Sequence, residues 1–177
     1  PGRGNAVRLA ASVATGDALV FFAPDGNEDP DNLIKLRDLI IEGNDMAIAS
    51  RFLPGARNEE DAFIFKPRAW ANKFFTFLVK IIWGGTISDT INGYRSIRKD
   101  KLIELNTDES GFAIEFQISI RALKLGFKVT EFPTIEGDRI GGHSTAYTIP
   151  TGLRVLGTLG KEILIGKNSP HSSVFCM

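Results

Sequence analysis

The hydrophobic and polar positions of this chain follow two different periods, and each change of period predicts a new element. Apolar runs at 18–22 and 46–49 predict short, buried strands of a parallel sheet, the second of which spans 45–50. Between them, residues 30–42 carry apolar side chains at helical spacing, which predicts a helix. A strand, a helix and a second strand in this order indicate a right-handed parallel crossover.

The rest of the chain continues the alternation of helices and strands. Strands are expected at 94–98 and 127–135, and helices at 5–14, 67–83, 99–105, 112–125 and 146–166. We therefore expect an α/β fold with a mostly parallel sheet flanked by helices, in one domain over residues 1–166. Residues 167–177 read as a loose tail. Because a Gly-rich turn and a helix come first, we expect that a first strand is missing by truncation.

The turn after the first predicted strand carries candidate chemistry. Pro24, which has no backbone N–H, ends the strand, and Asp29 and Pro30 are expected to cap and open the next helix. Asp25 and Asn27 then lie at the carboxyl edge of the sheet, where open α/β sheets bind ligands. Their oxygen atoms suit Mg²⁺ or Mn²⁺. A plain strand-to-helix turn explains the same residues equally well, since such turns favour Asp, Asn, Gly and Pro.

Four arginines are candidates for binding phosphate, because the planar guanidinium group matches phosphate oxygens. Arg51 directly follows a predicted strand, Arg68 opens a predicted helix, and Arg139 lies in a Gly-rich loop. Arg3 lies in the first turn, where it and the backbone amides could meet a diphosphate at a helix N-terminus. Taken singly, each arginine is more typical of a surface residue or of a partner for a carboxylate.

Composition limits the classes of function. The 177 residues are 43% hydrophobic and carry no net charge, which argues against a general nucleic-acid binder. The single cysteine excludes a disulfide framework and favours a reducing compartment. No apolar run reaches the length of a membrane span. Helix 67–83 is apolar on more than one face, which predicts either deep burial or a patch that faces a membrane.

Several motifs, in their order, resemble those of the family 2 glycosyltransferases of GT-A fold, in the branch of dolichyl- and polyprenyl-phosphate sugar synthases. The resemblance covers about residues 1–160. The segments that carry it are Gly2-Arg3-Gly4-Asn5-Ala6, Phe21 to Asn27, Ala49-Ser50-Arg51-Phe52, Asp89 to Arg95, Glu115 in its helix, and Glu136 to Ser144.

The resemblance implies a nucleoside-diphosphate sugar donor, a divalent metal (Mg²⁺ or Mn²⁺) and inversion at the anomeric carbon. Asp25 takes the place of the second carboxylate of the family's D-x-D motif, and Asn27 that of the amide ligand after it. The implied donor-binding residues are Arg3, Pro24, Asp25, Ala49, Arg51 and Arg139. The implied residues for an acceptor phosphate are Arg51, Arg68 and Arg139.

Three interpretations of the function stay open: two acceptors, and a protein that does not catalyse transfer. A polyprenyl phosphate would need alignment more than a base, and would make the protein cytoplasmic and peripheral to the membrane surface. A soluble hydroxyl acceptor would need a general base, for which Asp89 is the candidate. A non-catalytic relic is the third, because Ala23 replaces the first acidic residue of D-x-D and the first strand is absent.

Overall fold

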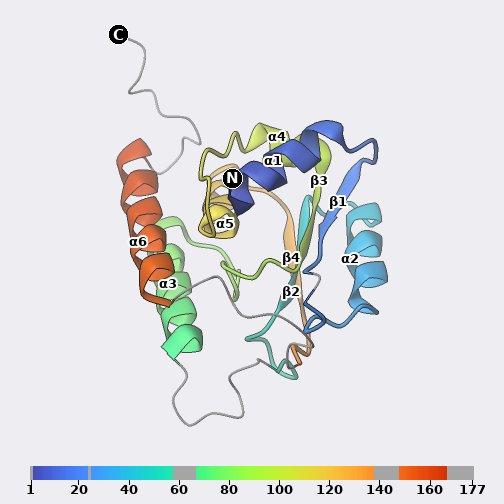
Figure 1. Cartoon of the computed structure of the whole chain (residues 1–177), viewed down its shortest axis with the longest axis horizontal. Helices are drawn as coiled ribbons and strands as arrows, with labels where there is room; N and C mark the ends of the chain where they lie inside the picture. Colours follow the sequence, from blue (N-terminus) through green and yellow to red (C-terminus); the bar gives the residue numbers. More distant parts are fainter. Residues whose placement is uncertain (1, 24, 58–66, 138–147, 167–177) are drawn as a thin grey trace.

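A four-stranded sheet organises the chain in the computed structural model, which describes residues 2–23, 25–57, 67–137 and 148–166. Its strands are β1 (Ala18–Phe21), β2 (Met46–Ser50), β3 (Arg95–Arg98) and β4 (Val129–Pro133). They lie in the order β1-β3-β2-β4 (Figure 1). The expected α/β fold is therefore confirmed, with a sheet in the middle and helices on both faces.

The pairing of the strands corrects one part of the prediction. β3 pairs antiparallel with both β1 and β2, and only β2 and β4 pair in parallel. The sheet is thus mixed: three strands point the same way, but β3 runs back between two of them. Apolar periodicity does not encode strand direction. That direction depends here on the loop before β3, which returns to the carboxyl edge of the sheet before the strand begins.

Helices form layers on either side of the sheet. α2 (Asn32–Ile41) covers one face, where it packs on β1, β2 and β3. The other face is covered by α1 (Arg3–Val13), α4 (Lys99–Glu104) and α5 (Ile114–Lys124). Outside α5 lie α3 (Pro67–Trp83) and α6 (Thr148–Ile165), which form a further layer (Figure 1). α5 is consequently buried on all sides, in agreement with its long run of buried residues.

The start of α1 differs from the prediction for a physical reason. The helix begins at Arg3 rather than Asn5, and its first turn packs tightly on residues 109–110. A Cβ atom on Gly4 would lie 1.9 Å from the carbonyl oxygen of Glu109, and the Gly4 N–H donates to Ser110 O at 2.9 Å. The glycines thus permit a close approach of backbone, and at least one amide of this turn is already used.

The helix after β1 also starts later than expected. α2 begins at Asn32 with Asp31 at the N-cap position, whereas the prediction placed the cap at Asp29 and the first helical residue at Pro30. Asp29 still supplies a capping contact, because its Oδ1 accepts the N–H of Asp31 at 3.0 Å. A turn at 30–31 therefore separates the capping side chain from the helix proper.

Two short pairings beyond the sheet bring distant segments together. Residue 57 pairs with residue 135, and the Glu136 N–H donates to Arg57 O at 2.9 Å. Glu136 also pairs with Glu28 in an antiparallel bridge, and the Gly137 N–H donates to Asn27 O at 2.8 Å. The segment after β4 is thereby held against the turn that follows β1.

None of the described helices is both long enough and apolar enough to cross a membrane. Some of the predictions fall outside the described residues. These are the tail at 167–177, Pro24 and Arg139, together with most of the long loop before α3.

Candidate active site

The turn after β1 is closed by a hydrogen bond to the carboxylate of Glu28. The Oε2 atom of Glu28 accepts the N–H of Ala23 at 2.7 Å, which closes the turn around Asp25 and Asn27. The hydroxyl of Tyr94 donates to Asp29 O at 2.7 Å and ties the end of the turn to the start of β3. We use the term strand-end site for the side chains that gather here: Asp25, Asn27, Glu28, Arg51, Asp89 and Glu136.

Arg51 is held rigidly at the end of β2. Its Nε and Nη2 atoms donate to the two carboxylate oxygens of Asp89 at 2.8 and 3.0 Å, in a bidentate pair. The Asp89 side chain is fully buried, while that of Arg51 is 14% exposed. Burial raises the pKa of Asp89, but the charge and hydrogen bonds of Arg51 outweigh it and leave the pKa below its usual value. Asp89 therefore stays ionised.

The geometry favours a positioning role for Asp89 over that of a general base. Besides the side chain of Arg51, it accepts the backbone N–H groups of Arg51 and Asn92. A carboxylate with a lowered pKa, no exposed surface and both oxygens engaged is a poor proton acceptor. Its observed contacts instead orient the Arg51 guanidinium group.

Residues of the sheet hold the loop at 88–93 in place. Glu131 of β4 accepts the N–H groups of Ser88 and Asp89 at 2.7 and 3.1 Å. Asn92 donates to Ala49 O at 2.5 Å, which links the loop to β2. Arg95 has no exposed surface, and it donates to Asn92 O and to the hydroxyl of Ser119. These contacts bring Asp89 to the same edge of the sheet as Asp25.

Glu136 joins the two halves of the strand-end site. Its Oε1 atom accepts the amide N–H of Asn27 at 3.1 Å, and its Oε2 atom lies 3.8 Å from Nη1 of Arg51. A continuous chain of polar contacts thus runs from the turn after β1 to the end of β2 and on to Asp89. Asn27 and Glu136, which are 109 residues apart in sequence, thus meet in one place.

The pKa of Glu28 is raised well above its usual value. Burial raises its pKa to about 7, the hydrogen bond from Ala23 opposes that rise, and the charges of Glu136 and Asp25 add to it. Arg3 is also close enough for its charge to lower the pKa of Glu28. The accumulation of acidic groups makes this part of the site attractive to a cation.

The donor atoms of the turn fit a hard divalent cation. The Oδ1 atom of Asn27 is buried and accepts no hydrogen bond from any residue that the structure describes, and Oδ1 of Asp25 is also buried. One carboxylate and one amide oxygen are ligands that Mg²⁺ and Mn²⁺ accept. No group of three or more acidic, histidine or cysteine side chains within the described ranges could hold a metal. Mg²⁺ commonly binds one or two protein groups and completes its shell with substrate phosphate oxygens and waters.

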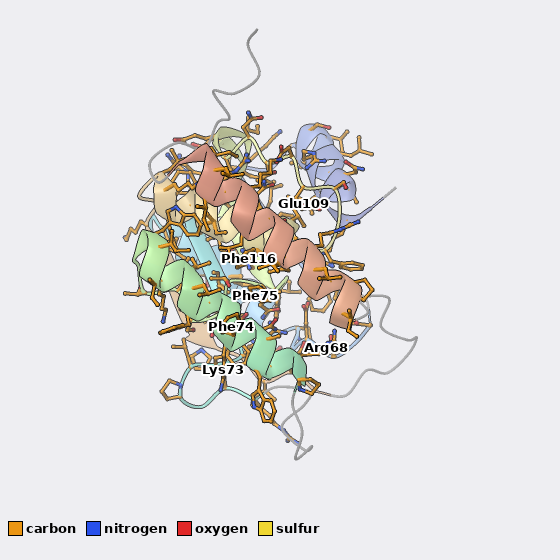
Figure 2. The ribbon with its side chains drawn as sticks, turned by 90° about the vertical axis from the view of Figure 1, so that its left-hand side faces the viewer. Arg68, Lys73, Phe74, Phe75, Glu109 and Phe116 are labelled. Atoms are coloured by element: carbon orange, nitrogen blue, oxygen red, sulfur yellow. The ribbon has the colours of Figure 1, made fainter. Side chains whose placement is uncertain are left out.

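The other predicted site residues lie in different surroundings. Arg3 forms an ion pair with Glu115 and lies over Gly93, at the border of the strand-end site. Ala49 is buried, and its carbonyl oxygen is occupied by Asn92. Arg68 belongs to the first turn of α3, at the end of the molecule to which β2 points (Figures 1 and 2). The roles assigned to these residues stay predictions.

Sequence reasoning did not identify Glu28 or Glu136 as members of the site. Glu28 and Glu136 are glutamates in polar loops, where a solvated carboxylate is the ordinary expectation. The one available signal was position: Glu28 follows the candidate metal ligands, and Glu136 opens the Gly-rich loop that contains Arg139. Their contact with each other depends on the pairing of residues 28 and 136, which no local pattern predicts.

Comparison with known proteins gives this arrangement a family. Residues 1–105 match the sequence profile described as Glycosyl transferase family 2. The chain belongs to glycosyl transferase family 2. It is 32% identical to polyprenol monophosphomannose synthase of Mycolicibacterium smegmatis over 131 residues, which are 71% of this chain and 48% of that protein.

Other relatives agree with this assignment. Dolichol-phosphate mannosyltransferase of Pyrococcus furiosus is 27% identical over 143 residues, or 81% of this chain and 40% of that protein. The resemblance to the branch of polyprenyl-phosphate sugar synthases is thus confirmed. This chain spans about half the length of such relatives.

A solved structure supports the fold independently. Glucosyl-3-phosphoglycerate synthase from Mycobacterium tuberculosis, in complex with uridine diphosphate, superimposes with a TM-score of 0.69 at 15% identity. The match covers 92% of this chain and 55% of that one. A second structure of that enzyme, with Mn²⁺, uridine diphosphate and glucosyl-3-phosphoglycerate, has a TM-score of 0.68 at 18% identity and covers the same shares. The GT-A type of fold is therefore confirmed for the described part of the chain.

Proposed function

We propose that this chain is part of an inverting glycosyltransferase that moves a sugar from a nucleoside diphosphate to a polyprenyl phosphate. The observation that carries the proposal is the convergence of the strand-end site. Glu136 joins the metal-type ligands of the 25–27 turn to the Asp89-bound Arg51. An acidic turn beside a fixed guanidinium group suits a diphosphate bound through a cation.

The donor would lie across the carboxyl edge of the sheet. Asp25 and Asn27 would hold Mg²⁺ or Mn²⁺, which would neutralise charge on the departing nucleoside diphosphate when bound. Arg51 offers its remaining guanidinium N–H groups to phosphate oxygens, because Asp89 holds the other edge of the group. Arg3 and Arg139 are further candidates for phosphate contacts, by their place in the family motifs.

The reaction needs alignment more than proton transfer. An oxygen of the acceptor phosphate forms a bond to the anomeric carbon, while the bond from that carbon to the donor's β-phosphate oxygen breaks with inversion. The leaving diphosphate takes the bonding electrons, so negative charge grows next to Arg51. A monophosphate with a second pKa of about 6 is largely ionised at neutral pH and needs no base. This agrees with the engagement of Asp89 by Arg51.

An apolar outer face supports a lipid as the acceptor. α3 and α6 lie side by side and turn one face outward, with Phe74 exposed on α3 and Phe75 packed inward against Phe116 (Figure 2). The exposed apolar side chains of the two helices are Trp70, Phe74, Phe77, Ile81, Ile149, Leu153, Leu156, Ile163 and Leu164. Such a face, bordered by lysines such as Lys73, suits the interface of an anionic membrane. Arg68, in the first turn of α3, would be near the acceptor phosphate.

The first prediction tests the donor end of the site. In the full-length protein, Asp25→Ala should lower sugar transfer at least about a hundredfold, because it removes a ligand of the cation that stabilises the leaving group. Transfer should be assayed with Mg²⁺ and Mn²⁺ and after chelation with EDTA. Asp38→Asn, on the exposed surface of α2, is a matched control and should not change the rate. Undiminished transfer by the Asp25 variant would remove this residue from the mechanism.

The acceptor is tested in the same assay by competition. Polyprenyl phosphate in vesicles should be glycosylated, whereas a soluble sugar hydroxyl or 3-phosphoglycerate should not. Transfer to a soluble acceptor alone would favour the alternative of a soluble-acceptor glycosyltransferase. No turnover of any nucleoside-diphosphate sugar would favour a binding module, the interpretation suggested by Ala23.

A further inference from the structure

The orientation of the Asn27 side-chain amide is not fixed by contacts within its own turn. A side-chain amide has an oxygen at one end and an NH₂ group at the other, and only the oxygen can bind a cation. Rotation of the amide by half a turn exchanges the two ends at little steric cost. For Asn27 to act as a ligand, another group must hold the NH₂ end away from the metal.

Glu136 is that group in the structure. Its carboxylate accepts a hydrogen bond from Nδ2 of Asn27 at 3.1 Å, and its side chain is only 13% exposed. An ionised carboxylate can only accept hydrogen bonds, so it selects the NH₂ end of the amide. Oδ1 of Asn27 is then left buried without a hydrogen-bond partner among the described residues. A buried acceptor of this kind is costly unless a ligand completes it.

The backbone reinforces the same contact. The Gly137 N–H donates to Asn27 O at 2.8 Å, and residue 136 pairs with residue 28. The second oxygen of Glu136 forms an ion pair with Nη1 of Arg51 at 3.8 Å, and Asp89 in turn holds that guanidinium group. Glu136 is therefore held by backbone on one side and by a guanidinium group on the other.

We propose that Glu136 is a positioning residue that fixes the amide of Asn27 with its oxygen toward a divalent cation. The inference rests on the proposed function, since it assumes that the 25–27 turn holds a metal. It adds to that function a role for the segment after β4, which orients a metal ligand in the turn after β1 through Glu136. Groups in the second layer around a metal are commonly worth 10–100-fold in affinity.

The decisive experiment reverses the direction of the hydrogen bond between Asn27 and Glu136. Glu136→Gln removes the acceptor that selects the amide orientation, and should weaken Mn²⁺ binding about tenfold. Asn27→Asp alone would place two carboxylates in contact and should also weaken binding. In the double variant E136Q/N27D the total charge equals that of the natural pair, and the Gln amide can donate to one oxygen of Asp. The other oxygen still faces the cation, so Mn²⁺ affinity should return to within about threefold of the natural protein.

Mn²⁺ affinity is read directly from the electron paramagnetic resonance signal of free Mn²⁺, with the full-length protein and either uridine or guanosine diphosphate. Blanks without protein correct for binding by the nucleotide. Glu104→Gln is the matched control, because it removes the same charge from an exposed pair on α4 at the opposite edge of the sheet. Thermal unfolding of each variant shows whether it is folded.

Three results would overturn the proposal: unchanged Mn²⁺ affinity in Glu136→Gln, a folded double variant that does not recover, or equal weakening in the Glu104 control. A natural protein that transfers sugar but binds no Mn²⁺ would also overturn it, while leaving the proposed function standing. Recovery in the double variant supports it, because a purely structural contact gives no reason for Mn²⁺ affinity to follow the direction of a hydrogen bond.

Discussion

The strand-end site and a cluster between α5 and α6 both contain buried charged side chains, and they differ in how completely the described residues satisfy them. The α5–α6 cluster consists of Arg121, Lys124 and Glu162, whose side chains are at most 3% exposed. Glu162 accepts from Arg121 at 2.8 Å and from Lys124 at 2.7 Å. Arg121 also donates to the carbonyl oxygens of residues 105 and 106. Every charge in this cluster has an internal partner.

The strand-end site is built differently. Asn27 keeps a buried oxygen that accepts no hydrogen bond from the described part of the chain, and Glu28 has a pKa raised to about 7. Three acidic groups, those of Asp25, Glu28 and Glu136, gather there beside the guanidinium group of Arg51, which is itself bound to Asp89. A stability role would favour a satisfied network such as the α5–α6 cluster. The difference therefore indicates that the strand-end site is completed by something that binds to it.

The comparison makes opposite predictions for the two regions, and the largest effect is expected in the α5–α6 cluster. Glu162→Ala would leave Arg121 and Lys124 buried without their shared partner, and should lower the free energy of unfolding by about 3–5 kcal/mol. For a domain of this size the melting temperature should fall by roughly 6–20 °C. Calorimetry or thermal circular dichroism measures this. Glu104→Gln, in an exposed pair, should change stability by less than about 1 kcal/mol. Similar losses of unfolding free energy in both variants would show that the α5–α6 cluster contributes no more to stability than an exposed ion pair.

The next effect concerns catalysis rather than stability. Arg51→Lys keeps a positive charge beside Asp89 but loses the planar fork that can bind Asp89 and phosphate at the same time. Sugar transfer by the full-length protein should fall about a hundredfold in kcat/KM, or about 2.7 kcal/mol. Arg37→Lys, on the exposed face of α2, is the control and should leave transfer unchanged. A variant that melts far below the natural protein yet transfers at its normal rate would assign Arg51 to stability instead.

The smallest effect is a dependence on pH. Because the pKa of Asp89 is lower in the folded protein than its ordinary value of 3.8, ionised Asp89 stabilises the fold above that pH. This contribution should disappear as the pH falls through the lowered pKa. Asp89→Asn should therefore cost about 2 kcal/mol at pH 7, with a smaller difference from the natural protein below about pH 3.8. Urea unfolding at several pH values measures this difference. A cost that does not change with pH would show that the charge of Asp89 is not what stabilises the loop.

The sequence by itself determined most of the elements. The helix at 67–83 has the predicted bounds, and the strands at 18–21 and 46–50 lie within one residue of theirs. This success has a local cause, since apolar period, capping residues and glycines act over a few positions. The motifs also sufficed to place the chain in its family and to bring Asp25, Asn27 and Arg51 to one edge of a sheet.

Only the tertiary structure decided how those residues are used. The reversal of β3 carries Asp89 to the carboxyl edge, where it binds Arg51 instead of standing free as a base. The pairing of residue 136 with residue 28 brings a distant glutamate onto Asn27. Such contacts join positions about 40 to 110 residues apart, and they depend on strand direction and on how loops return. No pattern over a short stretch of sequence carries that information.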